Sequence, residues 1–279
     1  MSAGRCATVA ALLALLPVGA LAAVPTAAPA AERHDFVTNY EQPATGDYGV
    51  YYDELRHERF LESVAAELNR VLDLPATVTL RTAECGHSTT IWAADTRTVT
   101  VCYEYLDAVL VIAGDNGVVP ERAEQMFSGA VTFALFAEIG RALVTLYALP
   151  VPAGAERAGD EFAAITLAAA EQGGDPSAGA ALEFFDLALK DPEAGLEFLD
   201  MHGFDRARLE AVACILYGNS PATHAEARAL LPPERIARCG EQVLAVAHQW
   251  DLYLKDHARG GSLPAPLAPK SPTVAPARS

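Results

Sequence analysis

Apolar residues recur every three or four positions between Asp53 and Leu74, with polar residues between them. This spacing places the apolar side chains on one face of a helix. Pro75 cannot continue a helix, so the predicted helix ends at Leu74. Its apolar face consists of Phe60, Leu61, Val64, Leu68, Val71 and Leu72.

Three short runs rich in Thr, Val and Ile come next, at Thr77–Arg81, Thr89–Trp92 and Thr98–Cys102. Runs of this length and composition are typical of β-strands. The segment Ala94–Arg97 provides a turn between the second and the third run. We therefore predict a small sheet with antiparallel members.

The rest of the chain has helical periodicity, interrupted by Pro and Gly at the joints. The expected helices are Tyr103–Ala113, Glu121–Ala148, Arg157–Glu171, Ala178–Lys190, Asp205–Tyr217, Thr223–Leu230 and Gly240–Ala258. The predicted fold class is α+β, with a small N-terminal β-sheet and a mostly α-helical remainder.

The first 30 residues have the pattern of a secretory signal peptide. Arg5 gives a positive start, and the apolar run Ala7–Leu16 is too short to span a membrane. Two A-x-A sequences place the cleavage site between residues 22 and 30. We predict an exported protein, in the periplasm or outside the cell, with no membrane span after cleavage.

The last residues, 261–279, are rich in Pro, Ala and Ser and have no periodic apolar positions. This composition is typical of a disordered tail. Residues 31–260 are then expected to form one domain.

The net charge excludes one large class of partners. Lys and Arg total 20 and Asp and Glu total 36, which gives a formal net charge of −16. Nucleic acids require clustered cations on the protein surface. We therefore expect no nucleic-acid partner.

Four cysteines remain after signal cleavage, and an even number in an exported chain favours two disulfides. Four cysteines allow three pairings. We favour Cys85–Cys102 and Cys214–Cys239, because each pair flanks a local group of elements.

The segment Phe133–Leu143 contains a degenerate catalytic motif. A zinc peptidase of the HExxH type holds its metal with two histidines at i and i+4, and the glutamate at i+1 polarises a water. Glu138 is in place here, but Ala137 and Arg141 occupy both histidine positions. Farther on, Glu156 and Asp160 have the spacing by which a second helix offers a third ligand and an acid that orients it.

At these residues the chain resembles a bacterial family of uncharacterised secreted proteins classed as zinc metallopeptidases with a zincin-like core. The similarity extends over about Asn39 to Leu254. The segments that carry it, besides the motif helix, are Thr82–Gly86, Asp95–Glu104, Leu149–Val151, Cys214–Gly218 and Arg238–Cys239.

The resemblance implies zinc as the cofactor of the family, Glu138 at the position of the general base, Glu156 at that of the third ligand and Asp160 at that of the orienting acid. The histidine ligands have no counterpart, because Ala137 lacks a donor atom and Arg141 is a permanent cation. We therefore expect no metal and a catalytically inactive pseudopeptidase, with a peptide or protein as partner in the former active-site cleft.

Arg141 offers a replacement for the metal charge. It lies three residues after Glu138, and its guanidinium can reach the vacated metal position and pair with Glu138 or Glu156. We expect it to act there as a structural counter-ion.

Two alternatives remain open at this point. An active metallohydrolase would hold its metal unusually, through Glu138, Glu156, Asp160 and a distant residue such as His87. A non-catalytic exported protein would bind a partner or serve only as a stable scaffold.

The seven histidines form neither HxxxH nor HxH. His87 follows the turn at Cys85-Gly86 and is the best candidate to line the cleft, although a surface position is the simpler expectation. The full set is His34, His57, His87, His202, His224, His248 and His257.

Overall fold

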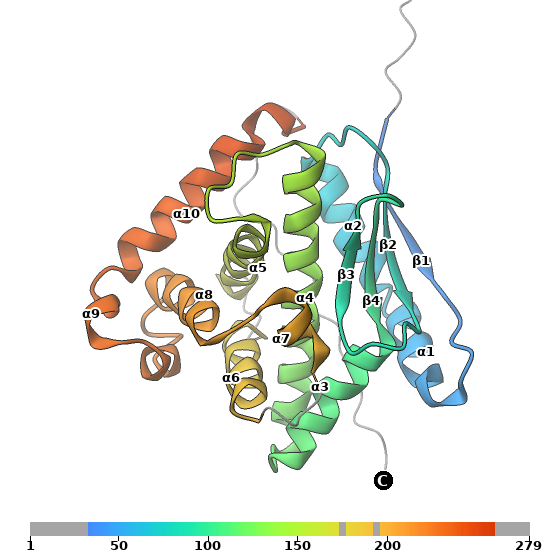
Figure 1. The fold of residues 1–279 in the computed structure, drawn as a ribbon, viewed down its shortest axis with the longest axis horizontal. Coiled ribbons are helices and arrows are strands. Elements are labelled where there is room, and N and C mark those ends of the chain that lie inside the picture. The colour runs from blue at the N-terminus through green and yellow to red at the C-terminus, as the bar shows by residue number, and fades with distance from the viewer. Residues whose placement is uncertain (1–32, 173–176, 192–195, 260–279) are drawn as a thin grey trace, which may run out of the picture. The chain divides into compact units, whose positions relative to one another are not determined.

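The computed structural model describes residues 33–172, 177–191 and 196–259. The predicted signal peptide with its cleavage site and the predicted tail lie outside these residues. The described part combines one small sheet with a larger helical portion (Figure 1). The α+β fold class expected from the sequence is confirmed.

The sheet has four strands in the order β1-β2-β4-β3. The strands are β1 (Phe36–Tyr40), β2 (Val78–Ala83), β3 (Thr90–Ala93) and β4 (Thr98–Cys102). β1, β2 and β4 run parallel to one another. β3 is an antiparallel edge strand, joined to β4 by the predicted turn. β1 was not predicted, because only its first residue, Phe36, is buried and its sequence therefore carries little apolar pattern.

The helix expected over Asp53–Leu74 is two helices, α1 (Gly49–His57) and α2 (Phe60–Val71). The chain breaks at Arg59, which has a left-handed backbone with φ of 54°. The Tyr40 hydroxyl accepts a hydrogen bond from the Leu61 N–H and donates one to Glu62. Such a bond satisfies a backbone donor that the first turn of a helix leaves open.

The helical portion follows the predicted helices closely, with three exceptions. The segment around Thr223–Leu230 contains a short 3₁₀ turn, Glu226–Leu230, in place of an α-helix. Two short helices, one before Gly203 and one at Pro233–Ile236, were not predicted. The helices are α3 (Tyr103–Asp115), α4 (Pro120–Leu146), α5 (Ala155–Gln172), α6 (Ser177–Lys190), α7 (Glu197–His202), α8 (Arg206–Asn219), α9 (Pro233–Ile236) and α10 (Cys239–Leu254).

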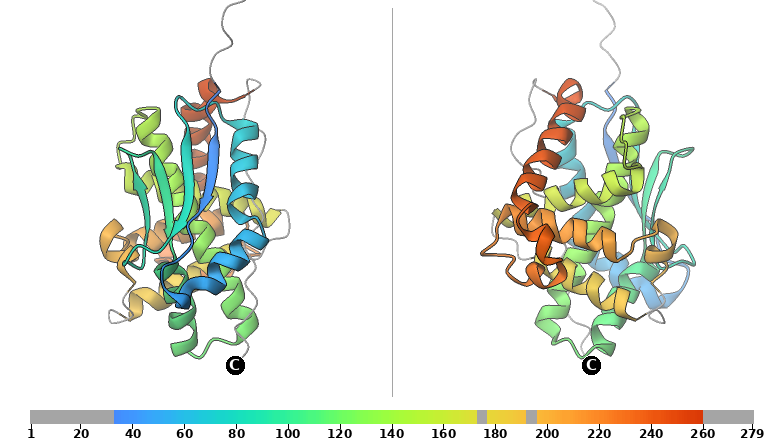
Figure 2. Two further views of the ribbon diagram at one scale, coloured as in Figure 1. Left: turned by 90° about the vertical axis from the view of Figure 1, so that its right-hand side faces the viewer. Right: turned by 60° about the vertical axis from the view of Figure 1, so that its left-hand side comes forward.

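The long helix α4 is the centre of the domain. It packs against β3 and β4 on one side and against α5 and α6 on the other, as the two views of Figure 2 also show. Every residue from Met126 to Val144 is buried. The helix is apolar and long enough to cross a membrane, but 89% of its apolar window is buried within the protein. A helix that is covered on all sides in this way is typical of a protein core.

Two glycines let α4 and α5 approach closely. A Cβ atom at Gly159 would lie 2.5 Å from the Ala137 carbonyl oxygen, and one at Gly140 would lie 2.9 Å from the Gly159 Cα. Both contacts are closer than packed atoms allow. The two glycines therefore set the spacing of the two helices, and with it the distance between Glu138 on α4 and Glu156 on α5.

Gly159→Ala is expected to lower the free energy of unfolding by about 2 kcal/mol, because the added methyl group forces α5 away from α4. Gly114→Ala on α3 is the matched control, since nothing lies within 4 Å of its Cβ position. Urea unfolding followed by circular dichroism measures both. A loss of similar size in the two variants would contradict the close approach.

Both disulfides preferred from the sequence are present. Cys85–Cys102 ties the loop after β2 to the end of β4, and Cys214–Cys239 ties α8 to the start of α10. Disulfides persist in oxidising compartments. The two bonds therefore fit an extracytoplasmic protein.

Candidate functional site

The site is built on the face of α4 that turns toward β3 and α5. Glu138 and Arg141 lie three positions apart on α4, so that their side chains are neighbours on one face. The Glu138 side chain is 1% exposed and the Arg141 side chain 5% exposed. Ala137 is also buried, and its backbone carbonyl lies against Gly159 of α5.

The guanidinium of Arg141 joins carboxylates from two helices. Its Nη1 lies 2.7 Å from Glu138 Oε1, and its Nε donates to Glu156 Oε2 at 2.9 Å. Its Nη2 lies 2.8 Å from Glu156 Oε2 and 3.7 Å from Asp160 Oδ1. Arg141 thus makes both of the pairs that the sequence suggested as alternatives.

Asp160 is held by a second arginine, Arg208 of α8. Arg208 Nε lies 2.6 Å from Asp160 Oδ2, and Nη2 lies 2.8 Å from Oδ1, which is a bidentate pair. The same guanidinium also donates to the backbone carbonyls of Glu156 and His202. Asp205, the N-cap of α8, accepts a hydrogen bond from the Arg208 backbone N–H.

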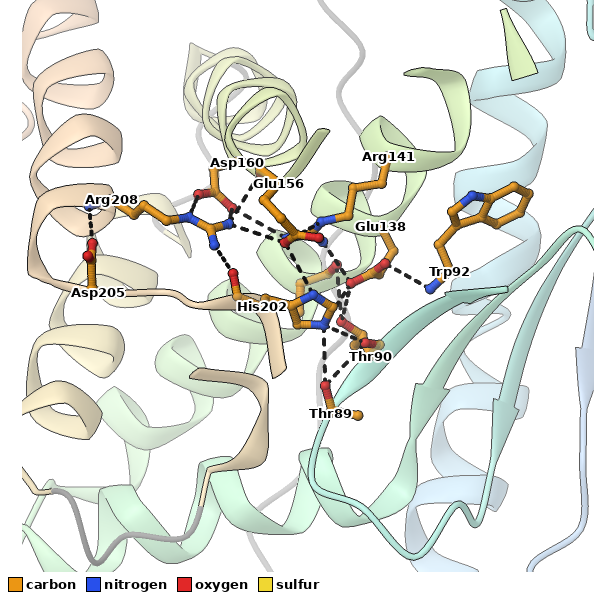
Figure 3. Close-up of polar contacts among 11 residues, drawn as sticks. Thr89, Thr90, Trp92, Glu138, Arg141, Glu156, Asp160, His202, Asp205 and Arg208 are labelled. Carbon is orange, nitrogen blue, oxygen red and sulfur yellow. Dashed lines mark hydrogen bonds and ion pairs between the residues drawn. The ribbon is translucent and has the colours of Figure 1, made fainter. Parts of the chain in front are cut away.

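His202, at the end of α7, closes the site from the side of the sheet (Figure 3). Its Nε2 lies 2.9 Å from the Thr90 carbonyl oxygen and 3.1 Å from Glu138 Oε1. Its Nδ1 lies 3.3 Å from Glu156 Oε2. Both ring nitrogens therefore face acceptors, and only the imidazolium donates from both.

We name these six residues, Glu138, Arg141, Glu156, Asp160, His202 and Arg208, the ion-pair cluster. With an imidazolium at His202, three cations face three carboxylates, and the charges of the cluster balance. Buried charges are tolerated when they are paired and hydrogen-bonded in this way.

The carboxylates of the cluster differ in their pKa shifts. Burial raises the pKa of Glu138, and the charges of Arg141 and His202 only partly oppose it. Burial likewise raises the pKa of Asp160 against the opposing hydrogen bond from Arg208. Glu156 is half exposed; burial raises its pKa, but the hydrogen bond from His202 and the charges of Arg141 and Arg208 outweigh burial and lower it. The two deeply buried carboxylates therefore depend most on their cationic partners.

The cluster also occupies polar groups at the edge of the sheet. The Trp92 N–H of β3 donates to Glu138 Oε2 at 2.8 Å, and the Thr90 carbonyl oxygen lies within hydrogen-bond distance of His202. Edge strands present such groups to other chains unless something covers them. At Thr90 and Trp92, side chains of the cluster cover them.

His202 and Arg208 were not identified from the sequence, and His87 is not part of the cluster. His87 lies at the surface, with its Nδ1 2.8 Å from Glu197 Oε2. His87 therefore has the surface position that was the simpler expectation, and as a candidate to line the site it is not supported. Its neighbour Ser88 instead anchors α7, by accepting hydrogen bonds from Glu197 N and Phe198 N, and α7 then carries His202 to the cluster.

The donor set does not fit a zinc ion. Ala137 offers no ligand atom, and Glu138 and Glu156 are already bound by cations. Within the part of the chain that the structure describes, one group of three residues has ligand atoms close enough to share a metal, namely Cys85, Cys102 and Glu104. Its two cysteines form a disulfide, so it provides no thiolate.

One of three comparisons with known proteins gives a match. A family model described as "Putative metallopeptidase" matches residues 40–254. Neither a curated protein nor a solved structure matches.

Proposed function

Because the chain belongs to the "Putative metallopeptidase" family, we propose that it is a non-catalytic member, in which the ion-pair cluster replaces the metal. Glu138 and Glu156 then keep the positions of the general base and of the third ligand without their chemistry. Asp160 serves as an anchor for Arg208 in place of an orienting acid.

One observation carries this proposal: the Arg141 guanidinium lies between Glu138 and Glu156 and contacts both. A cation fixed there repels a second cation, and Zn²⁺ requires free lone pairs on nitrogen, sulfur or oxygen donors. Both oxygens of Glu138 are also engaged, Oε1 by Arg141 and His202 and Oε2 by the Trp92 N–H. A general base needs an oxygen that can accept a proton from water.

The proposal includes export. The two disulfides and the N-terminal pattern of residues 1–30 support a periplasmic or extracellular protein. A peptide or protein bound in the former cleft would have to displace Glu138 and His202 from β3. An active metallohydrolase would require Arg141 to leave both carboxylates.

Zinc content tests the proposal. The mature chain, purified with its disulfides intact and without chelator, is expected to carry no zinc by mass spectrometry. The variant Ala137→His with Arg141→His is expected to bind about one zinc per chain, since it restores three protein ligands with Glu156. Ala137→His alone is the matched control and is expected to stay empty, because Arg141 remains.

Each outcome separates the alternatives. Stoichiometric zinc in the natural chain would overturn the non-catalytic assignment. If the double variant folds, as judged by circular dichroism, but binds no zinc, the assignment of Glu156 as the third ligand is wrong.

A further inference from the structure

The outer face of α10 is an exposed stripe of the described surface. α10 packs its inner face on α8 and α5 and lies at the edge of the domain in Figures 1 and 2. Leu244 is 72% exposed, more than any other large apolar residue among those described, and Leu252 is 43% exposed. The stripe consists of Glu241, Leu244, Ala245, His248, Asp251, Leu252 and Lys255.

The leucines and the outermost charges of this stripe are placed symmetrically about His248, whereas Ala245, three residues before it, corresponds to Asp251, three residues after it. Leu244 precedes His248 by four residues and Leu252 follows it by four. Glu241 precedes it by seven residues and Lys255 follows it by seven. Lys255 retains helical backbone angles, so the stripe continues through it.

An antiparallel copy of the same helix matches this pattern. With a twofold axis at His248, Leu244 of one chain faces Leu252 of the other, and Glu241 faces Lys255. The leucine contact and the opposite-charge pair then each occur twice, as an isologous interface requires. Ala245 is small and permits the two helices to approach closely.

We propose that the outer face of α10 binds a second copy of this chain and forms a twofold antiparallel helix pair. The interface is self-complementary at its leucine contacts and at its Glu241–Lys255 pairs. A single helix pair is smaller than a standard protein interface, and a net charge of −16 on each chain opposes association. The dimer is therefore weak and forms at high protein concentration.

Sedimentation velocity over a concentration series tests the interface. The mature chain is expected to show a reversible dimer. Leu244→Glu is expected to raise the dimer Kd at least about tenfold, as removal of a central apolar contact does. Val50→Glu adds the same charge at an exposed apolar residue of α1 and is expected to leave the Kd close to that of the natural chain.

Charge exchange tests the register. Glu241→Lys and Lys255→Glu each place like charges opposite one another, and each is expected to weaken the dimer. The double variant restores opposite charges, and so does a mixture of the two single variants. Restored dimer in both cases supports the antiparallel register about His248, and no restoration in either case overturns it.

A cysteine at the axis gives a covalent readout. His248→Cys is expected to form a disulfide-linked dimer under mild oxidation, whereas Leu244→Cys faces Leu252 and is not. A monomer at every concentration would overturn the proposal. So would a dimer that forms only after residues 260–279 are removed, because the tail would then be the occupant of this face.

Discussion

Arg141→Met is expected to lower the free energy of unfolding by about 3–5 kcal/mol, the cost of leaving a buried ion pair without one partner. Methionine keeps much of the side-chain volume but removes the charge that Glu138 and Glu156 share. Glu138 retains His202 as its only cation within 4.0 Å among the described residues. Urea unfolding of the disulfide-intact chain measures the loss.

The matched control is Arg157→Met on α5. Arg157 pairs with Glu161 at 3.2 Å, but its side chain is 47% exposed, so its loss is expected to cost less than about 1 kcal/mol. Adding Glu138→Gln to Arg141→Met removes the stranded charge and is expected to restore part of the stability. Equal losses in Arg141→Met and Arg157→Met would show that Arg141 is no buried counter-ion.

The same variant has an expected pH dependence. Burial raises the pKa of Glu138 in the folded protein, and without Arg141 the pKa rises further. A carboxyl group with a raised folded-state pKa binds a proton more readily in the folded than in the unfolded chain, so stability increases as the pH falls through that pKa. Arg141→Met is therefore expected to regain stability on acidification. Arg157→Met is expected to regain less, because its partner Glu161, whose pKa burial also raises, is 22% exposed, whereas Glu138 is 1% exposed.

The pairing of Arg141 with Glu138 could be predicted because helix geometry makes residues three apart neighbours. Its pairing with Glu156 followed from the spacing of a motif that the resemblance placed on two adjacent helices. The α+β class and most helices followed from apolar periodicity. Each of these predictions depends on the spacing of residues within one segment, or on the contact between two adjacent helices.

His202 and Arg208 could not be found in this way, because tertiary packing alone brings them to the site. α7 has six residues, too few for a periodic signal, and its position depends on bonds between Ser88 and the backbone of Glu197 and Phe198. A charge count gives the one usable signal. Three expected carboxylates and one arginine leave two negative charges unbalanced, and a buried site requires further cations.

The break between α1 and α2 has a similar cause. Arg59 adopts a left-handed backbone that the sequence gives no reason to expect, since glycine and asparagine are the usual residues there. The Tyr40 hydroxyl at the start of α2 comes from β1, which was itself not predicted. Because β1 was not predicted, the hydrogen bond that it provides at the start of α2 could not be predicted either.

Arg208→Met is the second large effect, with an expected loss of about 3 kcal/mol. Asp160 is almost fully buried and, among the described residues, would keep Arg141 at 3.7 Å as its only cation within 4.0 Å. The guanidinium also holds the His202 carbonyl, so α7 should loosen as well. Hydrogen exchange of residues 197–202 is therefore expected to speed up in the folded variant.

Arg206→Met is the matched control, two residues earlier in the first turn of α8. Arg206 pairs with Asp186 at 2.7 Å, but its side chain is 44% exposed, so the expected cost is below about 1 kcal/mol and exchange in α7 stays unchanged. Asp160→Asn in the Arg208→Met background removes the stranded charge and is expected to recover stability without slowing exchange in α7. Stability and α7 exchange that recover together would mean that the charge of Asp160, and not the bond from Arg208 to the His202 carbonyl, controls the position of α7.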